Sequence, residues 1–342
     1  MNYYHILKFV NKIKSPGIKT FGLWVMHVFK RRYIGVFLDP VMMCNLRCRM
    51  CYMSAEGYKP CSTPAEALMS PETLEYVADT FFPRALKLQI GCSTEPTLYR
   101  DLETVIKKAK DKGVPYVSIT TNGQRLSADK LHRIINAGLN EVTLSVHGFE
   151  KEVYEDMMRG ASFQRLVELM ASLRQAKAEY PDFKVRINYV INADNILSLR
   201  KMYDVFGGLR PDVLQLRPIQ RLGESSYNNF SHDEIKLHYD DVITPIVERC
   251  RKESTICLFP TKENLESFET EYDPMADFLE EYTYYYVFPS GVNKHEFRWL
   301  KDSFESYHRR ISTGMNIWKN IWKWRHKTAS KHSSRKLNYN IK

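Results

Sequence analysis

Short apolar runs alternate with amphipathic segments from about residue 34 to residue 252. The apolar runs are five to eight residues long and rich in Val, Ile and Leu, which is typical of buried strands. They cover residues 34–38, 86–91, 116–121, 141–146, 184–191 and 213–217. Because strand-like and helix-like segments alternate six times, the pattern predicts a parallel sheet with right-handed crossovers. Periodicity alone leaves a doubly wound sheet and an open barrel as alternatives.

Capping and turn residues mark the helices between these strands. Ser70, Ser127 and Ser162 suit N-cap positions, and Gly113 and Gly138 suit helix ends. The helices predicted in this way begin at Ser70 or cover residues 101–112, 127–138, 162–179, 194–206 and 231–252. In a βα barrel the chemistry lies at the carboxyl ends of the strands, so candidate site residues are expected there.

The two ends of the chain fall outside this alternation. Residues 1–33 begin with an apolar stripe at Ile6, Phe9, Val10 and Ile13, which predicts a helix that Ser15-Pro16-Gly17 ends. We therefore expect a helical extension over residues 1–33, a core over 34–252 and a C-terminal extension over 253–342. Residues 328–342 are expected to lack order.

Charge is distributed unevenly along the chain. The net charge is +10, but residues 1–32 and 306–342 contain 17 basic residues and no acidic ones. The remaining 273 residues carry 33 basic and 40 acidic residues, so the body is acidic. This distribution argues against a specific nucleic-acid-binding surface over the whole domain.

Trp318 and Trp322 lie four residues apart near the C-terminus, with Lys319, Lys323 and Lys327 beside them. On a helix these residues form adjacent aromatic and basic stripes, a composition typical of helices at anionic membrane surfaces. Docking of an acidic peptide or of a phosphate-rich ligand, and simple packing on the barrel, are the alternatives. No run of 18 apolar residues exists. We expect a cytoplasmic protein, with peripheral contact at the inner membrane face as a further expectation.

Three cysteines, Cys44, Cys48 and Cys51, follow the first predicted strand with the spacing C-x3-C-x2-C. Three thiolates on one loop can hold three corners of a [4Fe–4S] cluster. A structural zinc site requires four ligands, whereas a trio leaves one iron free to bind another molecule. The alternatives are a zinc site completed by a distant ligand and three unrelated buried cysteines.

This spacing resembles that of the radical S-adenosylmethionine (radical SAM) superfamily, and the resemblance covers roughly residues 34–220. It implies a partial (β/α)6 TIM-like barrel with one [4Fe–4S] cluster on Cys44, Cys48 and Cys51, and with SAM bound to the free iron. It further implies that reductive cleavage of SAM yields a 5′-deoxyadenosyl radical, which abstracts hydrogen from a substrate. A flavodoxin- or ferredoxin-like electron donor is the implied partner.

Further motifs support the resemblance and assign SAM-binding candidates. Gly91-Cys-Ser-Thr-Glu95-Pro looks like the family's Gly-Gly-Glu-Pro segment, which implies that Glu95 helps to hold the methionine amino group. By the same resemblance Thr121 lies near SAM and Ser145 contacts its ribose or carboxylate. Arg159 pairs with a carboxylate in this reading, with a simple surface charge as the alternative. Met50 takes a position that is often aromatic in the family and packs near adenine.

Other residues at strand ends are weaker candidates. His147 shares a strand face with Ser145, and Asn188 and Arg217 lie on the fifth and sixth strands. The four further cysteines show no dense spacing, so they are expected to behave as small apolar residues and the chain to hold one cluster. They are Cys61, Cys92, Cys250 and Cys257.

The sequence therefore predicts a radical SAM enzyme. A peptide or an envelope-associated molecule is favoured as substrate, because the barrel carries long extensions without extra clusters. Two alternatives belong to other classes: a zinc-binding structural or interaction protein, and a membrane- or RNA-binding protein whose barrel does not catalyse.

Overall fold

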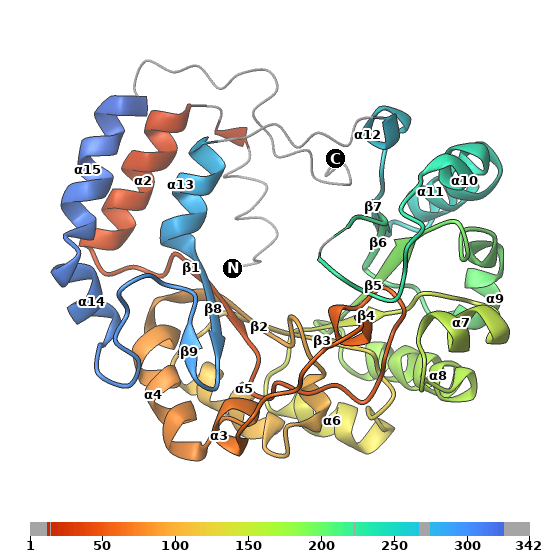
Figure 1. Cartoon of the computed structure of the whole chain (residues 1–342), viewed down its shortest axis with the longest axis horizontal. Helices are drawn as coiled ribbons and strands as arrows, with labels where there is room; N and C mark the ends of the chain where they lie inside the picture. The colour runs from red at the N-terminus through yellow and green to blue at the C-terminus, as the bar shows by residue number, and fades with distance from the viewer. Residues whose placement is uncertain (1–11, 14, 222, 267–273, 325–342) are drawn as a thin grey trace.

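A curved, open sheet of nine strands forms the centre of the computed structural model, which describes residues 12–13, 15–221, 223–266 and 274–324 (Figure 1). The strand order is β7-β6-β5-β4-β3-β2-β1-β8-β9, and every pair is parallel except β8 with β9. The strands are β1 (Ile34–Leu38), β2 (Ala85–Ile90), β3 (Tyr116–Thr121), β4 (Glu141–Ser145), β5 (Lys184–Ile191), β6 (Val213–Pro218), β7 (Ile256–Leu258), β8 (Tyr284–Phe288) and β9 (Gly291–Val292). This arrangement confirms the predicted partial barrel.

Helices connect the strands and cover the outer face of the sheet (Figure 1). Buried side chains such as Val36, Leu88 and Ile119 alternate along the strands and pack in one apolar core with residues of these helices. The helices of the core are α3 (Pro64–Ala67), α4 (Pro71–Phe81), α5 (Leu102–Asp111), α6 (Ala128–Asn136), α7 (Lys151–Met157), α8 (Phe163–Glu179), α9 (Met202–Phe206), α10 (Asp233–Leu237) and α11 (Thr244–Lys252). The other side chains of each strand therefore face the concave side of the sheet.

The predicted N-caps are mostly found. The Ser70 and Ser127 hydroxyls accept hydrogen bonds from Thr73 N at 3.1 Å and Lys130 N at 3.2 Å, as N-cap side chains do. The prediction of one helix over residues 231–252 is wrong. The segment divides into α10, a π-helical turn at Tyr239–Ile243 and α11, which has a proline at its start.

The C-terminal region contributes more than an appended extension. β7 joins the sheet beside β6, while β8 and β9 join at the opposite edge, where β8 pairs with β1 in parallel. The sheet thus has nine strands, three more than the six that the sequence predicted. This segment also contains the helices α12 (Lys262–Glu266), α13 (Pro274–Thr283), α14 (Phe304–Arg310) and α15 (Thr313–Trp324).

One helix of the N-terminal region, α2 (Pro16–Val28), begins after Ser15 and packs along α15, near α13 (Figure 1). The Trp318 and Trp322 pair thus lies on a helix, as predicted. The stripe from Ile6 to Val10 and the tail 328–342 lie outside the described residues. In the described part of the chain, no helix has the length and apolarity needed to cross a membrane.

Candidate active site

The loop that carries Cys44, Cys48 and Cys51 follows β1 at the carboxyl edge of the sheet. Backbone hydrogen bonds attach it to the end of α7, from Arg47 N to Arg159 O at 2.9 Å and from Arg49 N to Met157 O at 3.0 Å. Cys51 N also donates to Cys48 O at 2.9 Å, which turns the chain back on itself. These backbone hydrogen bonds hold the loop against the end of α7.

All three thiols are partly buried and affect one another electrostatically. Burial raises the pKa of Cys44 and Cys51, and burial together with the other two thiols raises the pKa of Cys48 to about 12. Amides approach one of the sulfurs, since Leu46 N lies 3.4 Å and Asn122 Nδ2 lies 3.7 Å from Cys44 Sγ. Such N–H donors stabilise a sulfur that carries negative charge, as in a metal-bound thiolate.

The donor set fits an iron–sulfur cluster better than a single ion. Within the part of the chain that is described, no three His, Cys, Asp or Glu side chains converge on one point where an ion would bind. Around one zinc ion the sulfurs would lie roughly 4 Å apart, from the Zn–S bond length and tetrahedral geometry. In a [4Fe–4S] cluster each thiolate binds a different iron, so the sulfurs are spaced more widely. Three thiols on one turn suit the second arrangement.

Glu95 connects the second and third strands at this edge of the sheet. Its buried carboxylate accepts hydrogen bonds from Thr97 N at 3.1 Å, from the Thr97 and Thr121 hydroxyls, and from Asn122 N at 2.8 Å. Asn122 in turn donates to Asn45 Oδ1 at 3.1 Å, beside Cys44. The structure thus brings Glu95 and Thr121 next to the cysteine loop, and Glu95 holds the loop that follows β3.

Asp39, directly after β1, is a second buried carboxylate. It accepts hydrogen bonds from Cys92 N at 2.7 Å, Ser93 N at 3.0 Å and the Tyr286 hydroxyl at 2.7 Å. Gly91, with φ at +80°, has no room for a Cβ, which would lie 2.4 Å from Thr120 O. Asp39 and Gly91 therefore fix the segment that resembles Gly-Gly-Glu-Pro, although two of its positions differ from the family's pattern.

Polar side chains line the concave face beside this edge. Ser145 on β4, Asn188 on β5 and Gln215 on β6 are register neighbours, and Arg217 lies one pair further along β6. The Asn188 Oδ1 atom is buried and accepts no hydrogen bond from the described residues. Arg186 donates to Gln215 Oε1 at 2.5 Å, so the polar lining continues toward the other end of the strands. This face offers hydrogen-bonding groups to a polar ligand.

Two other candidates have local partners. His147 Nδ1 accepts from Val190 N at 3.2 Å, and burial lowers the pKa of His147 to about 4, so this imidazole stays neutral at pH 7. Met50 Sδ lies 3.0 Å from Asn192 Nδ2 and packs in the small cluster that contains Ile219. Met50 therefore lies over the ends of β5 and β6, on the side opposite to Glu95.

Arg159 is the candidate that the structure does not bring into the site. Its guanidinium is half exposed and lies 4.0 Å from Asp156, while its carbonyl supports the cysteine loop. Arg49, on the cysteine loop, forms closer ion pairs than Arg159 does. It pairs with Asp156 and, at 2.9 Å, with Asp194. Arg49 was not singled out in the sequence, because nothing in its spacing distinguishes it.

The remaining cysteines have separate surroundings. The Cys92 thiol lies beside Gln89 on the concave face, and burial together with Asp39 raises its pKa well above the ordinary value. Cys250 and Cys257 contact each other between α11 and β7, away from the cysteine loop. Cys61 lies in the segment before α3.

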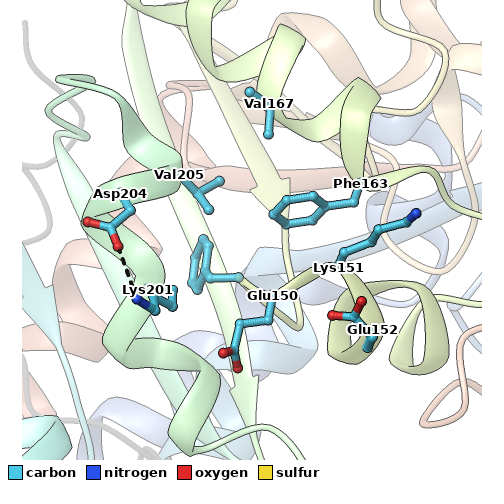
Figure 2. Close-up of a pocket in the computed structure, with 9 residues that line it drawn as sticks. Glu150, Lys151, Glu152, Phe163, Val167, Lys201, Asp204 and Val205 are labelled. Carbon is cyan, nitrogen blue, oxygen red and sulfur yellow. Dashed lines mark ion pairs between the residues drawn. The ribbon is translucent and has the colours of Figure 1, made fainter.

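One surface cavity, of about 430 Å³, lies between α7, α8 and α9 on the outer side of the sheet. Figure 2 shows Phe163, Val167 and Val205 at its apolar wall and a rim of charged side chains, including the Lys201–Asp204 pair. None of the predicted site residues lines this cavity, so it is separate from the candidate active site.

Comparison with known proteins agrees with the geometry of the cysteine loop. Residues 40–198 match the family model described as "Radical SAM superfamily". Over these residues, slightly less than half of the chain, it is similar to the radical SAM superfamily. Enzymes of this superfamily use a [4Fe–4S] cluster and SAM.

Relatives of this chain include two proteins named for a cyclase reaction. It is 30% identical over 202 residues to a probable GTP 3′,8-cyclase of Sulfurisphaera tokodaii and 28% identical over 198 residues to the GTP 3′,8-cyclase of Aquifex aeolicus. Each match covers 56% of this chain and 58% of the relative. The chain therefore spans less than two thirds of the curated relatives that it matches.

A solved structure shows the same fold at low sequence identity. Streptococcus suis SuiB bound to S-adenosylmethionine aligns with a TM-score of 0.57 and 16% identity, over 88% of this chain and 70% of that one. Similarity at this level supports the architecture of an open βα barrel and carries no statement about substrate.

Proposed function

We propose that the protein cleaves SAM reductively and uses the product to abstract a hydrogen atom from a polar substrate. Cys44, Cys48 and Cys51 would hold the [4Fe–4S] cluster. When bound, the cluster and SAM together supply a one-electron reductant and a source of the 5′-deoxyadenosyl radical. The observation that carries the proposal is the loop of three thiols, hydrogen-bonded to the Asn122 turn at the carboxyl edge of the sheet.

The chain's own residues have distinct tasks in this reaction. The Leu46 and Asn122 N–H groups stabilise the charge on Cys44 Sγ. Glu95 and Thr121 keep the loop after β3 against the cysteine loop, and one free direction of the Glu95 carboxylate would accept the ammonium group of SAM. Ser145 lies on the concave face where the rest of SAM would extend.

The substrate would occupy the concave face of the open sheet. Asn188 presents a buried oxygen without a donor, and Arg217 is half-buried without a hydrogen bond or ion pair among the described residues. A polar, hydrogen-bond-donating and anionic molecule would satisfy both groups. A peptide or an envelope-associated molecule remains the favoured class, and a flavodoxin- or ferredoxin-like protein would supply the electron.

A nucleotide substrate is the second candidate, favoured by the curated relatives that are named GTP 3′,8-cyclases. A nucleoside triphosphate is also polar and anionic, so the lining of the concave face suits it as well. Incubation with GTP, SAM and reductant separates the two candidates, because a cyclase converts GTP whereas a peptide-modifying enzyme leaves it unchanged.

Location is a separate matter from chemistry. Peripheral contact of the basic, aromatic ends with a membrane is a proposal, and it bears on where the enzyme works and not on how it cleaves SAM.

The test is SAM cleavage by the full chain after anaerobic reconstitution with iron and sulfide. With dithionite as reductant, we expect 5′-deoxyadenosine and methionine from the natural sequence and neither product from the Cys48→Ala variant. A matched control is Cys61→Ala, which should cleave SAM at the natural rate.

Two outcomes would contradict the proposal. Tight binding of colourless zinc, with no SAM cleavage, would support the structural alternative. Unchanged cellular function of the Cys48→Ala variant would support the alternative of a membrane- or RNA-binding protein with a non-catalytic barrel.

A further inference from the structure

Helix α2 exposes an apolar stripe on the side turned away from the described residues that it packs against. Its inner side contains the buried residues Thr20 and Leu23, whereas Ile18, Phe21 and Val28 are exposed at 59%, 49% and 46%. These three positions follow one another by three and seven residues, so they lie along one side of the helix. A helix that is apolar on both sides requires a second apolar environment.

Helix α15 has a stripe of the same kind. Ile317 and Trp324 are buried, while Met315, Trp318 and Trp322 are exposed at spacings of three and four residues. Four rings join the two helices in a row. The centroid distances are 6.1 Å from Phe21 to Trp24, 4.8 Å from Trp24 to Trp318 and 6.5 Å from Trp318 to Trp322. The two stripes therefore form one patch, which we call the α2–α15 surface and define by Ile18, Phe21, Trp24, Met315, Trp318 and Trp322.

Helices α2 and α15 carry basic residues and no acidic ones, whereas α13 beside α2 carries Asp277, Glu280 and Glu281, the last paired with Lys294 at 3.7 Å. The segments that contain it, residues 1–32 and 306–342, have no Asp or Glu, while the body of the chain is acidic. Lys319 and Lys323 are exposed next to the tryptophans, and Lys30 and Arg31 follow α2. The nearby acid Glu305 pairs with Arg84 at 2.8 Å, so it does not offset these cations.

A shallow cavity of about 390 Å³ adjoins the end of the patch. Val28 and Met315 form its apolar side, and its charged lining residues are Lys30, Arg309 and Glu305, the last paired with Arg84. A site of this composition accommodates a small anionic group next to apolar chains, which is the chemistry of a phospholipid headgroup.

We propose that the α2–α15 surface binds the enzyme to the face of an anionic membrane. Tryptophan rings and lysine ammonium groups both favour the zone between lipid headgroups and acyl chains, with the rings inserted and the ammonium groups on the phosphates. Six apolar side chains on two adjacent helices exceed the scattered apolar residues that an ordinary surface exposes. Because Figure 1 places α2 and α15 at one end of the molecule, with the cysteine loop elsewhere, membrane binding leaves the candidate active site uncovered.

The experiment is co-sedimentation of the full chain with vesicles. The probes are vesicles of phosphatidylcholine containing 30% phosphatidylglycerol, and vesicles of phosphatidylcholine alone as the neutral comparison. We expect binding to the anionic vesicles that weakens with salt. Lys319→Glu with Lys323→Glu should reduce the affinity by at least 25-fold, from about fivefold for each basic residue. Phe21→Ser and Trp322→Ser should each reduce it roughly tenfold.

Matched controls lie elsewhere on the surface. Leu237→Ser removes an equally exposed apolar side chain from α10, and Lys59→Glu with Lys252→Glu reverses two exposed charges outside the patch. These variants should bind vesicles as the natural sequence does. All variants should retain the natural rate of SAM cleavage, which shows that they fold and makes this proposal independent of the proposed function.

Three outcomes would overturn the proposal. The first is that the full chain does not bind anionic vesicles. The second is that the patch variants bind as tightly as the controls, which would mean that the basic tails bind the membrane instead. Concentration-dependent dimers that the Trp322→Ser variant abolishes, without vesicle binding, would instead identify the surface as a contact between two copies of the chain.

Discussion

Replacing Glu95 by glutamine changes one atom of a carboxylate that accepts four hydrogen bonds in the interior. Three of the donors point to Oε1 and come from Thr97 and Thr121, and the fourth, Asn122 N, points to Oε2. The Glu95→Gln side chain would keep its oxygen toward the three donors. Its amide group would then face the N–H of Asn122, so two donors would oppose each other.

The magnitude follows from this geometry. Loss of the charge-assisted bond to Asn122 N costs about 2 kcal/mol, and conversion of the other three to neutral bonds adds about 1 kcal/mol. For a chain of 342 residues the entropy of unfolding is roughly 0.7 kcal/mol per degree. We therefore expect the midpoint of thermal unfolding to fall by about 4 °C.

Scanning calorimetry of the cluster-free chain measures this shift, with Glu56→Gln, an exposed position, as the control that should move the midpoint by less than about 1 °C. SAM affinity of the reconstituted variant, measured well below the midpoint, then reports any direct contact. If the midpoint of thermal unfolding stays within 1 °C of the natural value, Glu95 does not stabilise the loop after β3 as described.

Further expectations concern the cluster and the pH dependence of stability. Cys48→Ala should lose the cluster and SAM cleavage, whereas Cys61→Ala should keep both, as iron analysis and product assays will show. Asn122→Ala removes the N–H near Cys44 Sγ and should lower the reduction potential of the cluster in a spectroscopic redox titration. Burial lowers the pKa of His308 to about 3, so only the unfolded chain takes up its proton between about pH 6 and 3.5. As the pH is lowered through this range, the free energy of unfolding therefore decreases by about 1.4 kcal/mol per pH unit because of this histidine. Chemical denaturation of His308→Gln should show a smaller dependence of the free energy of unfolding on pH.

Local patterns predicted the strands well because each strand is a short run rich in apolar residues that polar or turn residues bound. The segments 34–38 and 116–121 match β1 and β3 at both ends. The helix predicted over 231–252 was wrong because Pro245 lacks an N–H and its ring excludes a regular turn before it, so the backbone widens to a π-turn. The place of β8 beside β1 could not be predicted, since about 250 residues separate the two strands.

Some residues of the candidate site could also be predicted from the sequence, and others could not. The cysteine spacing is local, so it could be read directly, and the turn at Thr121 was found because it ends a strand. Asp39 was missed because its partners Ser93 and Tyr286 lie far from it in sequence. For Arg159 a carboxylate partner and a simple surface charge were the alternatives, because the direction of its side chain depends on how α7 ends. The structure leaves its guanidinium half exposed, 4.0 Å from Asp156.

The central claim is that three thiols on one loop hold a cluster with one iron open to SAM. Electron paramagnetic resonance of the reconstituted, dithionite-reduced chain tests it most directly, together with an iron count. The account predicts about four irons per chain and a [4Fe–4S]⁺ signal whose g-values shift when SAM is added. A signal that SAM leaves unchanged, or a chain that retains no iron, would contradict it.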